Sequence, residues 1–375
     1  MMTTDRIGLY VHIPFCRSKC RYCDFASFAQ VDSEKRRAYV KRLTDEILAY
    51  KGAGDSAVDT VFFGGGTPSL LTPAELSQMF EAINKSFKID PGAEITLEAN
   101  PKTLTREFVS TARTLGVNRV SLGLQSIHEN ELKYLGRIHT YDDFLSSYNM
   151  LFDGGIDNVN VDLMYGIPEQ SPESFMRTLC TVTELQPKHI SAYGLIIEEG
   201  TPFYKMRGTL PLPTEDEEAD MYYMAAEHLS ASGYGHYEIS NYAKAGFESR
   251  HNLKYWHDEE YIGVGLSAHS YLNSSRYYNT SSLDEYLLSS GVKYECKCDL
   301  SRNDVEYEYA MMRLRLSEGF SLLDYESRFG HSFLEGREAL LDKFKKARLI
   351  NFDDNCVSLT EEGFYLSNTV LSELL

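Results

Sequence analysis

The chain has 375 residues, 43% hydrophobic and 25% charged, an ordinary composition for a globular protein with one large domain and an appendage, or with two domains. A formal net charge of −18 at pH 7 argues against a nucleic-acid partner, because acidic surfaces repel phosphate backbones. No run of about 18 apolar residues occurs, so we expect no membrane span, although peripheral membrane contact is compatible with the sequence. The first residues lack the features of a signal peptide, and we expect a cytoplasmic protein.

Short β-rich runs alternate with helical patterns through the first half of the chain. The β-rich runs are 8–13, 58–63, 93–99, 118–123, 158–164 and 189–196. The clearest helical patterns between them are 34–50, 73–87 and 172–185. Thr72 and Pro73 are a typical N-cap and first helical residue. This alternation predicts an α/β fold whose parallel sheet is closed or nearly closed, a partial (β/α)6 barrel of the TIM type.

The alternation fades beyond residue 201. An acidic start predicts a helix within 212–233, and a Gly- and aromatic-rich segment follows at 235–280. The remaining elements are helices near 304–317, 321–329 and 334–347, β-like runs at 348–352 and 356–360, and a last helix. We therefore expect three parts: a core barrel over 1–235, a connecting region over 236–300, and a helical, winged-helix-like domain over 301–375.

Three of the seven cysteines crowd together as Cys16, Cys20 and Cys23, with the spacing C-x3-C-x2-C. An odd total with this uneven spacing does not fit a disulfide framework. Three thiolates can hold a [4Fe–4S] cubane and leave one iron open to a chelating small molecule. Zinc is the rival interpretation and needs a fourth ligand, for which Asp24 or His12 is available.

Unusual residues follow successive β-rich runs. The cysteine segment follows the first run and the glycines 64–66 follow the second, whereas Glu98, Gln125 and Asp162 lie at or just after the ends of the next three. Active sites of β/α barrels gather at the carboxyl ends of the strands. We expect all five segments on one rim.

Several motifs resemble the radical S-adenosylmethionine (SAM) superfamily, and in particular the branch that includes oxygen-independent coproporphyrinogen III oxidase and the haem chaperone family HemW. The cysteine spacing after the first strand is the superfamily's signature. The motifs that match the branch are YVHIPFC (10–16), GGGTPS (64–69), EANP (98–101), VSLGLQS (120–126), LGRIHT (135–140), VNVDLMYGIP (159–168), SAYGLIIEEGTPF (191–203) and ISNYA (239–243). The resemblance therefore covers most of the chain, and it implies a radical SAM core followed by a connecting region and a C-terminal domain like that of the oxidase.

The resemblance implies that SAM chelates the open iron of the cluster. Tyr10 would lie near its methionyl end, Gly65, Gly66 and Thr67 around its amino group, Glu98 at the ammonium, Arg137 at the carboxylate, Gln125 and Asp162 at the nucleoside, and Ile196 at the adenine. A phosphate-binding loop is disfavoured, because no Gly-Lys-Ser/Thr follows the glycines. A structural ion network of Glu98, Arg137 and Asp162 stays open as an alternative.

Two departures distinguish the oxidase from the chaperone family. Phe25 occupies the place of the oxidase's fourth cysteine, and Tyr10 comes too early for the oxidase's N-terminal extension. In contrast, HNLKYW (251–256) matches the HNxxYW segment associated with haem binding in the HemW family, which makes His251 the candidate haem ligand. From spacing alone, a surface histidine beside an aromatic core residue would be the better interpretation, and only the resemblance favours a haem ligand. His269 is expected near the SAM or haem pocket.

The favoured function is therefore that of a haem chaperone that binds a [4Fe–4S] cluster, SAM and haem and delivers haem to an acceptor protein. The alternative is a coproporphyrinogen dehydrogenase-like radical SAM enzyme that acts on a tetrapyrrole. A cluster protein for electron transfer alone would leave the SAM-binding set unexplained. The resemblance is also compatible with a homodimer.

Overall fold

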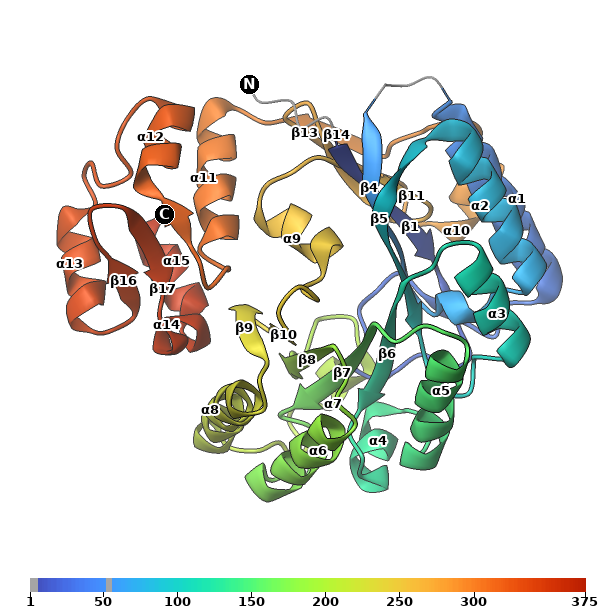
Figure 1. The fold of residues 1–375 in the computed structure, drawn as a ribbon, viewed down its shortest axis with the longest axis horizontal. Coiled ribbons are helices and arrows are strands. Elements are labelled where there is room, and N and C mark those ends of the chain that lie inside the picture. The colour runs from blue at the N-terminus through green and yellow to red at the C-terminus, as the bar shows by residue number, and fades with distance from the viewer. Residues whose placement is uncertain (1–5, 52–55) are drawn as a thin grey trace.

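A twelve-stranded sheet dominates the computed structural model, which describes residues 6–51 and 56–375 (Figure 1). Its centre is a run of six parallel strands in chain order: β1 (Arg6–Ile13), β4 (Ala57–Gly65), β5 (Lys88–Ala99), β6 (Arg119–Gln125), β7 (Val159–Tyr165) and β8 (His189–Gly194). The predicted α/β fold and its six parallel strands are confirmed.

The sheet is open, because later segments extend both of its edges instead of joining them. One edge continues from β8 through the antiparallel strands β10 (Asn241–Ala243) and β9 (Gly235–Glu238). At the other edge β11 (Tyr261–Val264) pairs parallel to β1. Antiparallel strands then follow as β12 (His269–Leu272), β13 (Ser275–Tyr278) and β14 (Cys296–Asp299). The partial barrel is confirmed, and full closure is wrong.

Helices cover the convex face of this sheet (Figure 1). They are α1 (Ser33–Ala49), α2 (Pro73–Ser86), α3 (Arg106–Thr114), α4 (Glu129–Leu135), α5 (Tyr141–Asp153), α6 (Pro172–Glu184) and α8 (Glu215–Ala231). Thr72 caps α2 in a reciprocal capping box with Glu75, as the sequence predicts for its start. Smaller elements are η1 (Pro68–Leu70), α7 (Pro202–Met206), α9 (Arg250–Trp256), α10 (Leu283–Leu288) and the short strands β2 (Phe15–Cys16) and β3 (Phe28–Ala29).

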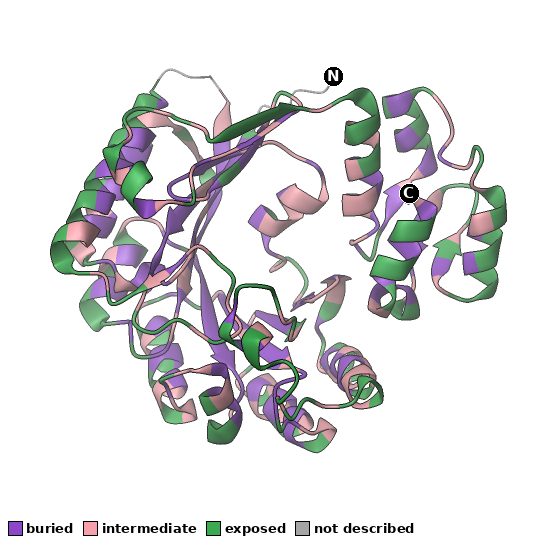
Figure 2. Ribbon diagram, turned by 180° about the vertical axis from the view of Figure 1, so that it is seen from behind, coloured by how far each residue is buried: buried purple, intermediate pink, exposed green. Residues whose placement is uncertain are grey.

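The two faces of the sheet differ in chemistry, because successive side chains of a strand point to opposite sides. In β5, Ile95 and Leu97 join the apolar core beneath the helices, whereas Glu98 lines a cavity on the concave side. The same alternation puts Leu122 of β6 in the core and Ser121 on the cavity. Figure 2 shows the central strands as largely buried. The concave face is therefore polar, and the functional residues gather there.

The C-terminal part contains helices and a small antiparallel sheet of order β15-β17-β16, with a hydrophobic core of its own around Tyr325 and Phe333. Its elements are α11 (Arg302–Arg313), β15 (Phe320–Ser321), α12 (Leu322–Phe329), α13 (Glu338–Lys346), β16 (Ile350–Phe352), β17 (Cys356–Leu359), α14 (Glu361–Tyr365) and α15 (Ser367–Leu374). The predicted helices and β-like runs are confirmed. None of the helices in the described ranges combines the length and apolar character that crossing a membrane requires.

Candidate cofactor-binding site

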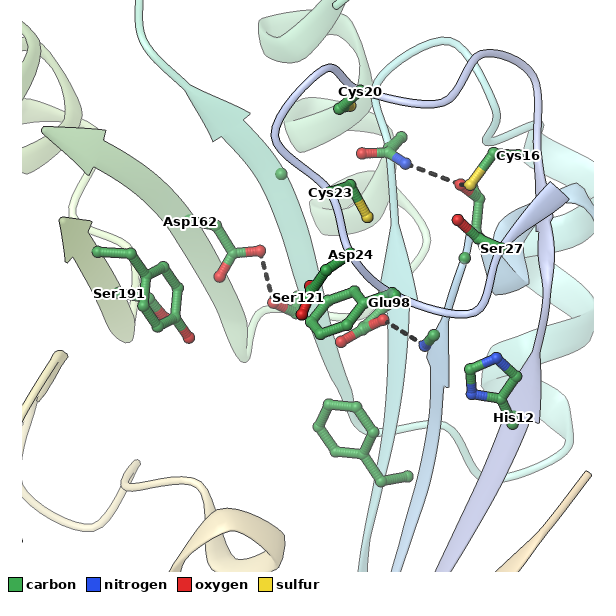
Figure 3. A pocket seen from close by; sticks show the side chains of 18 of the residues that line it. His12, Cys16, Cys20, Cys23, Asp24, Ser27, Glu98, Ser121, Asp162 and Ser191 are labelled. Carbon is green, nitrogen blue, oxygen red and sulfur yellow. Dashed lines mark hydrogen bonds between the residues drawn. The ribbon is translucent and has the colours of Figure 1, made fainter. Parts of the chain in front are cut away.

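A cavity of about 1030 Å³ opens on the concave face, at the carboxyl ends of the parallel strands (Figure 3). The residues predicted for the cluster and for SAM all line it: Tyr10, Cys16, Cys20, Cys23, Gly65, Gly66, Thr67, Glu98, Gln125, Arg137, Asp162 and Ile196. They come from six strands and the segments that follow them, as expected for the rim of a β/α barrel. His251 is the one predicted residue that does not line this cavity.

The cysteines lie on a loop whose base is closed by the parallel pair β2 and β3, where Cys16 is opposite Ala29. All three thiols are half-buried and unpaired, and burial raises the pKa of Cys16 and Cys23. Within the described ranges no three Cys, His, Asp or Glu residues converge as ligands of a single metal ion. A cubane places each thiolate on a separate iron, so its ligands do not have to meet at one point.

His12 lies beneath the loop and is not available as a further ligand. Its Nε2 is 2.9 Å from the Ala26 carbonyl oxygen, and its Nδ1 is 3.0 Å from the Tyr10 hydroxyl. Both ring nitrogens are therefore engaged, and the side chain is only 5% exposed. His12 is a packed polar residue of the concave face.

Close packing of the chain against itself explains the glycines after β4. Gly65 has φ +107°, and a Cβ there would lie 2.4 Å from the His12 ring. A Cβ on Gly66 would lie 2.7 Å from the Phe15 carbonyl oxygen. Both positions thus need glycine because the cysteine loop lies against them. The sequence suggested a close approach of a ligand instead, and the structure shows that the protein's own atoms already impose this requirement.

Glu98 is a half-buried carboxyl with few hydrogen-bond partners. Its Oε2 accepts a hydrogen bond from the Gly65 backbone N–H at 3.0 Å (Figure 3). Burial, followed by repulsion from Asp162, raises its pKa to about 8, against the smaller opposing effects of Gly65 and Arg119. A cationic group in the cavity would lower that pKa and stabilise the charged form. Glu98 therefore fits the ammonium group of an amino acid.

Arg137 has one buried nitrogen atom without a hydrogen-bond partner among the described residues. Its Nη1 donates to Asn100 Oδ1 at 2.6 Å and its Nη2 to the Tyr22 hydroxyl at 2.7 Å, whereas its buried Nε has no partner in the described part of the chain. A buried N–H without an acceptor is costly, and a ligand carboxylate would satisfy it. Arg137 thus fits the predicted carboxylate contact.

A hydrogen-bonded chain links this guanidinium to the cluster loop. Asn100 Nδ2 donates to Thr67 Oγ1 at 2.8 Å, and Thr67 Oγ1 donates to Cys16 Sγ at 3.6 Å. Asn100 is a connecting residue that the sequence did not single out, although it lies within the EANP motif. The thiol end and the carboxylate end of the predicted SAM site are therefore built on one network.

Asp162 is held on the neighbouring strand β7. Its Oδ2 accepts from Ser121 Oγ at 3.0 Å (Figure 3). Its Oδ1 accepts from Asn160 Nδ2 at 2.7 Å. Burial is the main reason that its pKa is raised. Each carboxylate oxygen keeps a further lone pair for a ribose hydroxyl.

No ion pair joins Glu98, Arg137 and Asp162 in the ranges the structure describes, since each bonds to neutral partners. The alternative of a structural ion network therefore has no support. Gln125 lies at a register irregularity at the end of β6, with φ +71°, and is buried at the cavity wall.

The rim beside the cysteine loop is apolar. Ile196 is 69% exposed, Phe25 60% and Ile138 54%, and all three line the cavity. Phe25 stands where the oxidase of this branch would have a fourth cysteine, so this rim position is apolar in the present chain. Ile196 thus lies at the mouth, where a flat adenine ring would have an apolar neighbour.

His251 lies in α9, which packs on the concave face. It is 1% exposed, with Nδ1 2.9 Å from Thr60 Oγ1 and Nε2 2.8 Å from the Tyr255 hydroxyl. Burial lowers its pKa to about 3. It is therefore not the surface histidine that spacing alone would fit, and both ring nitrogens are engaged with hydroxyl groups. Its neighbours Tyr255 and Trp256 do line the cavity.

Sequence reasoning missed the far wall of the cavity. Tyr261, Tyr271 and Arg276 come from β11, β12 and β13 and line this wall. His269 of β12, which was expected near a pocket, also lines the cavity, level with Gly263 and Tyr10 across the sheet. Arg119 was also missed; it is 2% exposed and lies on the polar face between the strands of Glu98 and Asp162. The alternation of aromatic and small residues in 261–278 was the available signal.

Comparisons with known proteins agree with this arrangement. Residues 10–180 match the radical SAM superfamily, whose members bind SAM at a [4Fe–4S] cluster, and residues 300–366 match the HemN C-terminal domain. The chain is 33% identical to the heme chaperone HemW of Bacillus subtilis, over 98% of both chains. It is 34% identical to the heme chaperone HemW of Lactococcus lactis, over 98% of this chain and 96% of the relative.

Among solved structures, the coproporphyrinogen III oxidase HemN of Escherichia coli superposes with a TM-score of 0.86, over 98% of this chain and 90% of that one. Its sequence identity of 23% shows a shared fold alone. Full-length identity above 30% to the HemW proteins shows more. The chain belongs to the radical SAM superfamily and, within it, to the HemW family.

Proposed function

We propose that this chain is a haem chaperone: it binds haem in the cavity of the concave face and passes it to an acceptor protein. Two relatives named heme chaperone HemW align with almost the whole chain. The observation that carries the proposal is a single cavity of about 1030 Å³, which reaches from the cysteine loop to the aromatic residues Tyr255 and Trp256. This volume is at the upper end of the range of about 300–1,000 Å³ for small-molecule sites, which suits two ligands.

At one end of the cavity, Cys16, Cys20 and Cys23 would hold the cluster, and SAM would fill its open iron. Glu98, with its raised pKa, and Arg137, with its unpartnered Nε, support the amino-acid end of that ligand. Tyr10, Gly65, Gly66 and Thr67 line the same end, while Gln125, Asp162 and Ile196 line the path toward the nucleoside. When bound, the cluster supplies an electron to SAM, and the protein positions SAM and limits its contact with water.

The second candidate function is a radical SAM enzyme that acts on a tetrapyrrole. It is favoured by the cavity that the cysteine loop and the aromatic residues share, since a tetrapyrrole bound there would be open to the cofactors that Cys16, Cys20 and Cys23 would hold. Phe25 in place of a fourth cysteine supports the chaperone instead, because this departs from the oxidase's pattern.

Haem titration of the anaerobically reconstituted protein tests the proposal. We expect a Soret band that saturates near one haem per chain, followed by transfer of that haem to apomyoglobin, used as a generic acceptor. SAM and a strong reductant, added with coproporphyrinogen, should yield no decarboxylated product. A protein that takes up no haem would contradict the chaperone function, whereas product formation would favour the enzyme.

The proposal extends to the surroundings of the protein. We infer a cytoplasmic location, since the free cysteines of the cluster site fit a reducing compartment, and a haem-acceptor protein as partner. A homodimer and a peripheral contact with a membrane belong to the proposal as well, and size-exclusion chromatography and vesicle flotation test them. The proposed division is a radical SAM core at 1–235, a connecting region at 236–300 and a HemN-type C-terminal domain at 301–375.

A further inference from the structure

The haem-binding end of the cavity has a different available imidazole from the one that the sequence motif suggests. We propose that His269, on β12, ligates the haem iron in this chain, and that His251 is a positioning residue that holds the cavity floor. This inference rests on the proposed function, since it names the contact by which the same cavity would hold haem.

His251 has no nitrogen to offer. Its Nδ1 is hydrogen-bonded with Thr60 on β4, and its Nε2 with Tyr255 on its own helix. A metal ligand needs a lone pair on the nitrogen that faces the iron, and here each nitrogen faces a hydroxyl group. Ligation by His251 would leave the Thr60 or the Tyr255 hydroxyl buried without its partner.

The helix that carries His251 is fixed in place on the sheet. Glu94 of β5 accepts hydrogen bonds from the backbone N–H groups of Arg250 at 3.1 Å and His251 at 3.0 Å. The buried Lys254 ammonium lies 2.9 Å from Asp59. A Cβ on Gly8 would come within 3.3 Å of both the Lys254 side chain and the His251 ring, so α9 sits directly on β1. Turning the His251 ring toward the cavity would break its hydrogen bonds with Thr60 and Tyr255, because the helix itself is held in place.

His269 is placed in the opposite way. It lines the cavity, its side chain is exposed, and no hydrogen-bond partner for its ring occurs in the described residues. Its ring stacks on Tyr278 of β13, with centroids 5.0 Å apart and planes 27° apart. The alternating side chain, Ser270, faces the other way and bonds to the Gly263 backbone. His269 is therefore oriented by the sheet and by one aromatic neighbour, with its nitrogens available.

The other histidines that line the cavity are excluded by their contacts. Both ring nitrogens of His12 are bonded, beneath the cysteine loop. His139 is 6% exposed, its Nε2 is hydrogen-bonded with the Leu124 carbonyl oxygen, and it lies near Arg137 at the SAM end. Among the described residues that line the cavity, His269 is therefore the imidazole with ring nitrogens free for a metal.

The surroundings of His269 suit a flat ligand with carboxylate groups. Tyr255, Trp256, Tyr261 and Tyr271 supply aromatic surface around this end. Trp256 Nε1 is buried and has no hydrogen-bond partner in the described part of the chain, so it can donate a hydrogen bond to a ligand. A porphyrin with propionate groups offers ring surface, acceptor oxygens and a metal together. Burial also lowers the pKa of His269, which favours the neutral form that binds metals.

The test compares haem coordination in full-length protein variants. Ferric haem is titrated into wild type, His269→Ala, His269→Gly, His251→Gln and the control His331→Ala, whose histidine lies in the C-terminal part. Electron paramagnetic resonance and magnetic circular dichroism then identify the axial ligand. We expect histidine ligation in wild type, His251→Gln and His331→Ala, and its loss in His269→Ala with haem binding weakened by about tenfold or more. Added imidazole should restore the wild-type spectrum in His269→Gly.

Opposite outcomes are distinguishable. If His269→Ala keeps histidine ligation, the assignment is overturned while the chaperone function stands. If wild type binds no haem at all, the proposed function fails together with this assignment. If His251→Gln does not fold, the imidazole experiment on His269→Gly still tests the proposal. Histidine ligation that is unchanged in His269→Gly, with no effect of added imidazole, would contradict it.

Discussion

The two ends of the cavity are built in different ways. The cysteine end consists of a loop and strand ends that follow one another along the chain, from β1 to β7, and its polar groups keep donors and acceptors unpaired for a ligand. The remote end consists of β11 to β13 and the buried helix α9, which lie together only through long-range pairing with β1 and β4. The residues predicted to bind the cluster and SAM thus lie in short sequence motifs at one end. The aromatic surface at the other end is assembled from segments far apart in the sequence.

The largest expected effect breaks the cysteine end alone. Replacement of Cys16, Cys20 or Cys23 by alanine should abolish the cluster, because a cubane with two protein thiolates is not retained. Iron content and the broad cluster absorbance measure this loss after anaerobic reconstitution. Cys180→Ala and Cys356→Ala are the matched controls and should keep both. Retained cluster absorbance in any of the three variants would show that the ligand set is wrong.

The next largest effect is on stability, and it distinguishes the buried His251 from the exposed His269. His251→Ala should lower the free energy of unfolding by about 2–4 kcal/mol, because it removes a buried ring and leaves two hydroxyl groups without partners. His269→Ala should change it by less than about 0.5 kcal/mol, since the side chain is exposed. Urea denaturation of both variants measures the difference. Equal destabilisation would mean that the two histidines do not differ as described.

Glu98→Gln should weaken SAM binding by about 10- to 100-fold, the usual effect of losing a hydrogen bond to a charged group. Because the pKa of Glu98 is raised to about 8, the carboxyl group of the ligand-free protein is mostly protonated at neutral pH, and the cation binds its charged form. SAM affinity should therefore rise with pH from about 5.5 to 7, below the α-amino pKa of about 7.7–8.0. Calorimetry should find a weaker pH dependence in Glu98→Gln, and Glu107→Gln is the control.

The smallest effect concerns the apolar rim. Ile196→Ala should leave stability unchanged within about 0.5 kcal/mol, because the side chain is mostly exposed. SAM affinity should fall by only a few fold, about 1 kcal/mol for the loss of a partly covered apolar contact. Equilibrium binding to Ile196→Ala, with Leu288→Ala as an exposed apolar control, measures it. A loss as large as that of Glu98→Gln would place Ile196 much deeper in the site than the structure does.

Much of the fold followed from local patterns. The six parallel strands and the capped start of α2 are visible in short windows, because alternation and capping act over a few residues. The opening of the sheet was not visible in this way. It depends on β11 pairing with β1 across most of the chain, and no local pattern specifies such a partner.

In the candidate site, too, the residues within local motifs could be predicted, and those placed by long-range contacts could not. Glu98 and Arg137 could be singled out because they stand within motifs at strand ends, and the structure brings both to the cavity. The orientation of His251 could not be inferred, since its burial depends on Thr60, which lies far away in sequence. The sequence correctly indicated that position 65 needs a glycine. The atoms that exclude a larger residue there belong to the His12 ring and not to a ligand.

The pairing of β1 with β11 has a consequence for how the protein is made. The strand that leads into the cysteine loop gains its second neighbour only when residues 261–264 have been synthesised. Until then β1 is an exposed edge, which favours association with other unfinished chains. We therefore expect nascent chains that stall before this point to need chaperone protection, and the cofactors to be loaded only after translation has passed it.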